Sequence, residues 1–447
     1  MDKSRLQFFL DNPTKALWTL ALPIMAGMGI QTLYTIVDMI FIGRLGGNAI
    51  AAVAFIMPLF FLILGLTFGL GSGVTASIAR FIGARDKINA DNSAEHAVFL
   101  GLIISAVLTT TGLVYGETIL RKLGATEEIL PQSWSYLKVT CFGLPFLIIS
   151  SSFRSILAGE GDMKTPMLIA GLGTILNIIL DPIFIFTLGY GIAGAAIATV
   201  LSQIIVFSIF VYMIFVREHT YIRFRLRDFS YSGFIIRDII QVGLPASISM
   251  IIMSFGQLVF NRILIFYSTD AVAAFQVGGR LDMVIHLPIM AIAASLTTMV
   301  GMFYGAHEIE KMKFIVKYGL SRSFTITVIT SALLYLFAPR IVTVFTNEQS
   351  IQSLAVVYLR YILLVYPLIS IGMSVGRILQ GIGKGLPMLV ITSIRILLVS
   401  APLAVFFTMI LHKPVYWVWY AMMISTVISV TISIVWLKTA FHKIVLA

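Results

Sequence analysis

The stretch from Ile50 to Ala79 reads IAAVAFIMPLFFLILGLTFGLGSGVTASIA and contains no charged residue. A helix needs around 20 mostly apolar residues to cross the hydrocarbon core of a bilayer, which is about 30 Å thick. Residues 50–79 therefore predict a membrane-spanning helix. The whole chain shares this character: of its 447 residues, 59% are hydrophobic and 11% are charged, and the mean hydropathy is +0.98.

That composition excludes several classes of protein. Soluble domains average roughly 45–50% apolar and about 25% charged residues, so a soluble enzyme and a disordered scaffold are both excluded. A single cysteine, Cys141, allows no intramolecular disulfide and no cysteine-based metal site. The sequence therefore predicts an integral membrane protein of the cell membrane.

Eleven further stretches are as apolar as residues 50–79. None shows the alternating pattern of about ten residues that an outer-membrane barrel strand requires, so we expect an all-α integral membrane protein with twelve transmembrane helices. The predicted spans are 15–43, 50–79, 94–116, 132–153, 165–187, 191–216, 237–267, 271–303, 315–338, 353–376, 387–411 and 415–437.

The distribution of Lys and Arg predicts the orientation. If the N-terminus is cytoplasmic, 21 of the 31 Lys and Arg residues lie in cytoplasmic segments and helix ends, whereas five lie outside and five in helix interiors. This bias follows the positive-inside rule, so both termini should be cytoplasmic. The net charge is +11, and the longest basic stretch, Arg217 to Arg227, lies in the loop after span six. We interpret that loop as a topology signal and a contact for anionic lipids, with no nucleic-acid partner.

The sequence repeats itself at an offset of 222 residues. Pro23 aligns with Pro245, and Phe81–Ala84 aligns without a gap with Phe303–Ala306. We therefore expect two six-helix halves, an N-lobe over residues 1–216 and a C-lobe over 237–447, joined by a basic cytoplasmic linker over 217–236. Because six spans is an even number, the repeats should be parallel, around a central cavity, as in alternating-access transporters.

Two acids lie inside predicted spans of the N-lobe, where a charge is costly and by default indicates function. Asp38 lies in span one, and Asp181 lies in span five with Asn177 one turn before it. Thr199 in span six and Tyr136 in span four fall in the same outer half of this repeat. We expect these five side chains to form one polar site.

The repeat shows what the fold itself requires at these positions. Asp38 aligns with Phe260, and Asp181 aligns with Pro402 after a one-residue shift. Since the second half has no acid at either position, fold maintenance does not demand one. A structural role for each acid, as a hydrogen-bonding group between helices, stays open as the alternative.

The C-lobe has its own polar residues within or near spans, namely Arg280, Asp282, His286 and Arg395. Asp282 and His286 are four residues apart and share a helix face. A structural network and a second proton or substrate site are both open here.

Motifs of soluble enzymes are missing or weak. The sequence has no Walker A segment. Gly71–Ala76 loosely fits a dinucleotide-binding pattern, but it lies inside a span, where small residues indicate close helix packing. His307-Glu308 lacks the second histidine of a zinc-binding helix. We therefore expect no enzymatic activity and no cofactor.

Several of these features together resemble a known family. Twelve spans in two parallel halves, Pro23 in span one, Gln31–Tyr34 followed by Asp38, and Asn177 with Asp181-Pro182 are similar to the multidrug and toxic compound extrusion (MATE) family. The resemblance covers the chain from about Asn12 to span twelve and is strongest to the DinF-like prokaryotic branch.

The resemblance implies a cation-coupled antiporter that exports organic, often cationic and amphipathic compounds. It also implies a site built from Asp38, Tyr136, Asn177, Asp181 and Thr199, with a hinge at Pro23. The sodium-coupled NorM-type branch of the family has an acid in span seven, where this chain has Met253. Because of this difference, we expect the acids of the N-lobe to bind the coupling cation.

The coupling ion stays open between H⁺ and Na⁺. Asp38, Asn177, Asp181 and Thr199 offer oxygens that suit a sodium ion or a proton equally. A lipid-linked saccharide or lipid flippase is the alternative transporter, and a non-transporting membrane receptor is a distant one. We expect small organic substrates and membrane lipids as partners, and a monomer.

Overall fold

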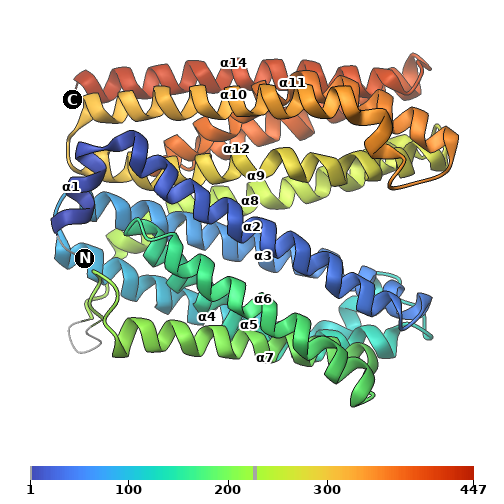
Figure 1. The fold of residues 1–447 in the computed structure, drawn as a ribbon, viewed down its shortest axis with the longest axis horizontal. Coiled ribbons are helices and arrows are strands. Elements are labelled where there is room, and N and C mark those ends of the chain that lie inside the picture. The colour runs from blue at the N-terminus through green and yellow to red at the C-terminus, as the bar shows by residue number, and fades with distance from the viewer. Residues whose placement is uncertain (1–2, 225–228, 447) are drawn as a thin grey trace. The chain divides into compact units, whose positions relative to one another are not determined.

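The computed structural model describes residues 3–224 and 229–446, and each regular element in those ranges is a helix (Figure 1). The linker residues Arg225 and Arg227 lie outside the described ranges. The helices are α1 (Lys3–Asp11), α2 (Pro13–Gly43), α3 (Gly47–Gly83), α4 (Lys87–Lys122), α5 (Leu130–Gly159), α6 (Lys164–Pro182), α7 (Gly191–Val211), α8 (Gly233–Leu264), α9 (Thr269–Gly305), α10 (Ile309–Val342), α11 (Gln349–Gly381), α12 (Leu386–Ser393), α13 (Ala401–Val405) and α14 (Tyr416–Leu446). Wider π-helical turns extend α6, α7, α12 and α13 over Ile183–Thr187, Tyr212–Val216, Ile394–Ser400 and Phe406–Ile410.

The prediction of twelve transmembrane helices is confirmed: twelve helical stretches in the described part of the chain are long and apolar enough to span a membrane. Most of the helices are longer than the predicted spans, most clearly α4, which begins at Lys87 rather than 94, and α14, which ends at Leu446 rather than 437, whereas span six keeps its predicted bounds of 191–216. The predicted spans end at the first polar turn because they are defined by apolar residues, whereas the backbone hydrogen bonds of the helix continue through that turn.

The chain forms two compact units. Unit 1 comprises residues 1–7 and 22–243, and unit 2 comprises residues 8–21 and 244–447. The first part of α2 thus belongs to unit 2 and the first part of α8 to unit 1. The chain passes between units at Gln7–Phe8, at Ala21–Leu22 and at Gly243–Leu244, and at the last two points a proline, Pro23 or Pro245, follows within two residues.

Corresponding helices of the two units carry the sequence repeat. Displacement by 222 residues takes both ends of α3 onto the ends of α9, Gly47–Gly83 onto Thr269–Gly305. One hydrogen bond between helices also repeats. Thr75 Oγ1 donates to the carbonyl oxygen of Ser155 at 3.0 Å, and Thr297 Oγ1 donates to that of Arg377 at 3.1 Å. The two units therefore share helix boundaries and a specific contact, as the repeat predicts.

In each unit one helix lies among the others: α5 packs against α3, α4 and α7, and α11 packs against α9, α10 and α14. Small residues allow this close packing, because helices in a membrane associate through van der Waals contact and hydrogen bonds. A Cβ added at Gly159 would lie 2.9 Å from Cβ of Ile78, and one added at Gly381 would lie 2.7 Å from the carbonyl oxygen of Thr297. Larger residues at either glycine would separate the helices.

The described part of the linker is docked on unit 1 through buried polar side chains. Glu160, 1% exposed, follows α5 and accepts hydrogen bonds from the Thr220 hydroxyl, from Tyr221 N at 3.1 Å and from Ile222 N at 3.0 Å. Burial raises the pKa of the Glu160 carboxyl, although these hydrogen bonds act in the opposite direction. Asp91 accepts a further bond from Arg223 N at 2.9 Å.

The end of the linker and the start of α8 are held in unit 1 as well. Ser232 N donates to His96 Nε2 at 3.1 Å, and Arg80 Nη2 forms a charge-assisted pair with the Asp238 carboxylate at 2.6 Å. Next to that pair, a Cβ at Gly73 would lie 2.2 Å from the carbonyl oxygen of Ile239, so α8 touches α3 backbone to backbone. The small residues of Gly71–Ala76 thus serve helix packing.

We predict that Glu160→Ala releases the linker. The substitution leaves three donors without their acceptor, at a cost of about 1–3 kcal/mol. We expect faster trypsin cleavage at Arg217 and Arg223 and a melting temperature a few degrees lower. Glu127→Ala is the matched control, since its partner Arg121 forms only an exposed ion pair with it, which contributes little. Equal cleavage rates for Glu160→Ala and the unmodified chain would contradict the assignment.

Candidate functional site

Asp38 and Asp181 meet in unit 1 near the ends of two helices. Asp38 lies five residues before the end of α2, and Asp181 lies at the end of α6, directly before Pro182. Each carboxylate is within electrostatic reach of the other. The two side chains that the sequence places at similar depths are therefore close enough to interact.

Asp181 is the more deeply buried of the two acids. Its side chain is fully buried, and its Oδ1 accepts a hydrogen bond from Asn177 Nδ2 at 2.9 Å. Asn177 is 3% exposed. The π-helical turn Ile183–Thr187 follows directly, and such turns are frequent at functional sites because they shift side chains out of the regular helical register.

Three hydroxyl-bearing side chains complete the cluster. Tyr34 lies one turn before Asp38 on α2, beside Thr199 of α7 and within electrostatic reach of both acids. Tyr136 of α5 is likewise within electrostatic reach of Asp38 and Asp181. The structure therefore brings together all five residues that the sequence suggested and adds Tyr34. Its spacing of four residues from Asp38 is the signal that could have identified it.

One side of this polar cluster is apolar. Ile42 of α2, Val53 of α3, Ile185 of the π-helical turn and Ile192 of α7 belong to a buried core against which Tyr136 packs. Apolar walls lower the local dielectric constant and strengthen every electrostatic interaction inside. Two neighbouring carboxylates in such a place disfavour each other's ionised form.

One oxygen of each carboxylate lacks a hydrogen-bond donor among the described residues. These atoms, Asp38 Oδ1 and Asp181 Oδ2, are buried. Buried polar atoms are normally satisfied, so an unsatisfied one indicates a missing proton, ion or water. With Thr199 and the amide oxygen of Asn177 beside them, the donor set fits a hard cation or a proton.

In unit 2, Asp282 has a different environment. Tyr358 Oη donates to Asp282 Oδ2 at 2.7 Å, and His286 Nδ1 lies 2.9 Å from the carbonyl oxygen of Asp282, to which it donates. The His286 ring meets Tyr366 edge to face, with centroids 5.4 Å apart. Tyr358 itself packs against Trp419 in the apolar core. Asp282 thus fastens α9 to α11.

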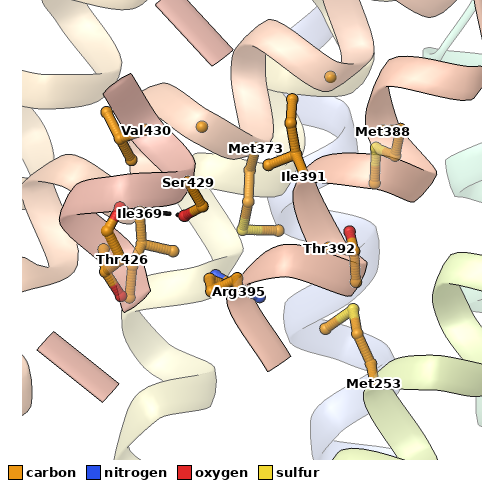
Figure 2. Close-up of a pocket in the computed structure, with 12 residues that line it drawn as sticks. Met253, Ile369, Met373, Met388, Ile391, Thr392, Arg395, Thr426, Ser429 and Val430 are labelled. Carbon is orange, nitrogen blue, oxygen red and sulfur yellow. Dashed lines mark hydrogen bonds between the residues drawn. The ribbon is translucent and has the colours of Figure 1, made fainter. Parts of the chain in front are cut away.

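The two arginines of the predicted C-lobe network lie apart. The Arg280 side chain is exposed and lies two residues before Asp282, on another side of α9. Arg395 lies within electrostatic reach of His286 and Tyr366 and lines a separate cavity, which Figure 2 shows. Met253, which stands where the NorM-type branch has an acid, lines the same cavity.

Comparison with known proteins identifies the family. The MatE family model matches residues 23–183 and again residues 245–406. The second match starts 222 residues after the first, in agreement with the internal repeat.

Individual relatives cover nearly the whole chain. The chain is 29% identical over 394 residues to the probable multidrug resistance protein NorM of Thermotoga maritima, covering 87% of this chain and 84% of that one. It is 27% identical over 391 residues to the multidrug export protein MepA of Staphylococcus aureus, covering 86% and 85%. A solved structure of a MOP superfamily transporter from Pyrococcus furiosus is 35% identical, with a TM-score of 0.94, and the match covers 99% of this chain and 98% of that one.

The family model matches well over half of the chain, and the fold agrees with that of the solved relatives over nearly its full length. Together with twelve candidate membrane spans, these matches show that the chain is a multi-pass membrane protein that belongs to the MatE family of multidrug and toxic compound extrusion transporters.

Proposed function

We propose that this protein is a proton-coupled antiporter that exports organic compounds, many of them cationic and amphipathic, by alternating access. The observation that carries the proposal is the pair of carboxylates in one apolar site, each with a buried oxygen that has no donor among the described residues. The names of the relatives, which describe multidrug resistance and export, support organic substrates. The Lys and Arg distribution supports cytoplasmic termini.

The site acts as a charge switch. When a proton enters from outside, it joins the Asp38–Asp181 pair and removes the repulsion between the two carboxylates. With one negative charge instead of two, the pair attracts a cationic substrate less strongly, so the substrate leaves. When the proton leaves toward the cytoplasm, the recovered charge favours the next cationic substrate.

Pro23 is the proposed hinge of this cycle. Proline removes one backbone hydrogen bond and weakens the helix around it. The helix changes units just before this proline: its residues up to Ala21 belong to unit 2, and its residues from Leu22 onward belong to unit 1. A bend at Pro23 would therefore move Tyr34 and Asp38 away from their present positions relative to the first turns of α2.

Sodium coupling is the second candidate, because Asn177 and Thr199 add neutral oxygens to the two carboxylates. Protons are preferred here because the position of the NorM-type acid is occupied by Met253.

We predict that Asp38→Asn and Asp181→Asn each reduce the export of a cationic dye such as ethidium at least about tenfold, a difference of 1.4 kcal/mol. Asparagine preserves size and hydrogen-bonding capacity but does not titrate, so the melting temperature should stay nearly unchanged. Asp270→Asn, the same chemical change in the first turn of α9, is the control and should leave export intact. Full export by either site variant at matched expression would remove that acid from the mechanism.

We also predict that an imposed pH gradient alone drives dye counterflow in proteoliposomes. The membrane potential is clamped with potassium and valinomycin, and sodium is omitted on both sides. Export should rise with the size of the gradient and should not change when a sodium gradient is added. Transport that needs sodium and ignores the pH gradient would contradict proton coupling and would favour the sodium site.

A further inference from the structure

A cavity of ≈ 30 Å³ lies within unit 2, among α8, α11, α12 and α14 (Figure 2). Its walls are mostly apolar and flexible, with Met253, Met373 and Met388 as the largest contributions and Val430 beside them. Methionine side chains are polarizable and adapt to ligands of different shape. None of these residues belongs to the Asp38–Asp181 cluster, so the cavity is a separate feature of the molecule.

Arg395 supplies the charge of this cavity. It lies in the π-helical segment Ile394–Ser400, and Figure 2 shows its guanidinium among the lining side chains. Among residues 3–224 and 229–446, no ion pair or hydrogen bond is found for it. An arginine within a membrane-spanning helix normally pairs with an acid or a carbonyl group. Because Arg395 is half-exposed at the cavity and has no such partner among the described residues, its N–H donors are available to an anion that enters the cavity.

The neighbouring hydroxyl groups agree with an anion rather than a cation. Thr392 lies one turn before Arg395 and lines the cavity with it, so it can donate a second hydrogen bond. Thr426 and Ser429, across the cavity on α14, already donate to carbonyl oxygens of their own helix at 2.8 Å and 3.0 Å. No carboxylate of the described part of the chain lines the cavity. The donors that face it are therefore Arg395 and Thr392.

The dimensions of the cavity select the ligand. One water needs about 10–15 Å³ on this scale, so a cavity of ≈ 30 Å³ accommodates two or three atoms of that size. The two oxygens of a carboxylate match this volume and also match the guanidinium in a bidentate arrangement. The attached hydrocarbon or aromatic group would lie in the open space that adjoins this cavity, where the total non-atom volume, solvent included, is ≈ 430 Å³ and the methionine side chains can contact it.

We propose that Arg395 and this cavity form a second ligand site, which binds the carboxylate group of an amphipathic organic acid. Arg395 holds the carboxylate through paired N–H donors, and Thr392 donates to one of its oxygens. Met253, Met373 and Met388 pack against the apolar part. The site goes beyond the proposed export of cations, since it recognises the opposite charge and lies wholly in unit 2.

The test measures binding to the purified, full-length protein in a neutral detergent by isothermal titration calorimetry. Three probes share one apolar group and differ in charge: 4-phenylbutyrate, neutral 4-phenylbutanamide and cationic 4-phenylbutylamine. Acetate tests the need for the apolar group, and phenyl phosphate tests whether a larger anion is accepted. We expect saturable binding of 4-phenylbutyrate, at least about tenfold tighter than that of the amide or the amine, and weak binding of acetate and phenyl phosphate.

Variants of the lining residues then test whether 4-phenylbutyrate binds in this cavity. Arg395→Gln should weaken 4-phenylbutyrate binding at least about tenfold, and Val430→Phe, which keeps the charge but fills the cavity, should weaken it similarly. Arg360→Gln is the matched control, because Arg360 is an exposed arginine of the same unit that lies over the Tyr335 ring. Asp38→Asn should also leave this binding unchanged, which separates this proposal from the export mechanism.

Three results would overturn the proposal. These are the absence of saturable 4-phenylbutyrate binding, equal affinity for the carboxylate and the amide, and unchanged binding in a folded Arg395→Gln variant. If that variant does not fold, Val430→Phe and the three-probe comparison on the unmodified chain still decide. Tighter binding of phenyl phosphate than of 4-phenylbutyrate would show that the carboxylate assignment is wrong.

Discussion

The repulsion between two carboxylates in one apolar site is the constraint on which the account of this transporter depends. Asp38 and Asp181 come from different helices, and each presents a buried oxygen without a donor among the described residues. In an environment of low dielectric constant, a second negative charge is far more costly than in water. A cation that joins the pair therefore changes the energy of the site by much more than a surface charge would.

The repeat separates what holds the fold together from what the site adds to it. Both units use the same contact between threonine and a neighbouring helix, at Thr75 and at Thr297, and the same glycine position at the end of the central helix. At the position of Asp38, unit 2 has Phe260, which is buried in its apolar core. The same scaffold thus accepts an aromatic side chain there, so the acid is not needed for packing.

Much of this could be predicted from the sequence. Twelve spans follow from apolar length, and the convergence of Asp38, Asn177, Asp181, Thr199 and Tyr136 follows from their matching depths. Tyr34 was missed as a site residue because a tyrosine on a span is also an ordinary packing residue. Tyr34 is recognised as a site residue only by its position beside Thr199 and near both acids.

Other features depend on tertiary contacts that no local pattern encodes. The basic linker suggested a topology signal and a contact for anionic lipids, whereas its docking through Glu160 and His96, which accept from linker backbone N–H groups far away in the sequence, was not predictable. Arg280 and Arg395 looked equivalent as arginines of the second half. The register of α9 leaves Arg280 exposed, whereas the π-helical turn brings Arg395 to a cavity.

The most direct test of the central claim is to count the protons that the protein releases when it binds a cationic substrate. Ethidium is added to the purified protein in a weakly buffered solution with a pH indicator and without sodium. If the dye and the proton compete for the Asp38–Asp181 pair, each bound dye should release up to about one proton from the unmodified chain. The Asp38→Asn/Asp181→Asn double variant should release none. Binding of the dye without proton release, or equal release from the double variant, would contradict the account.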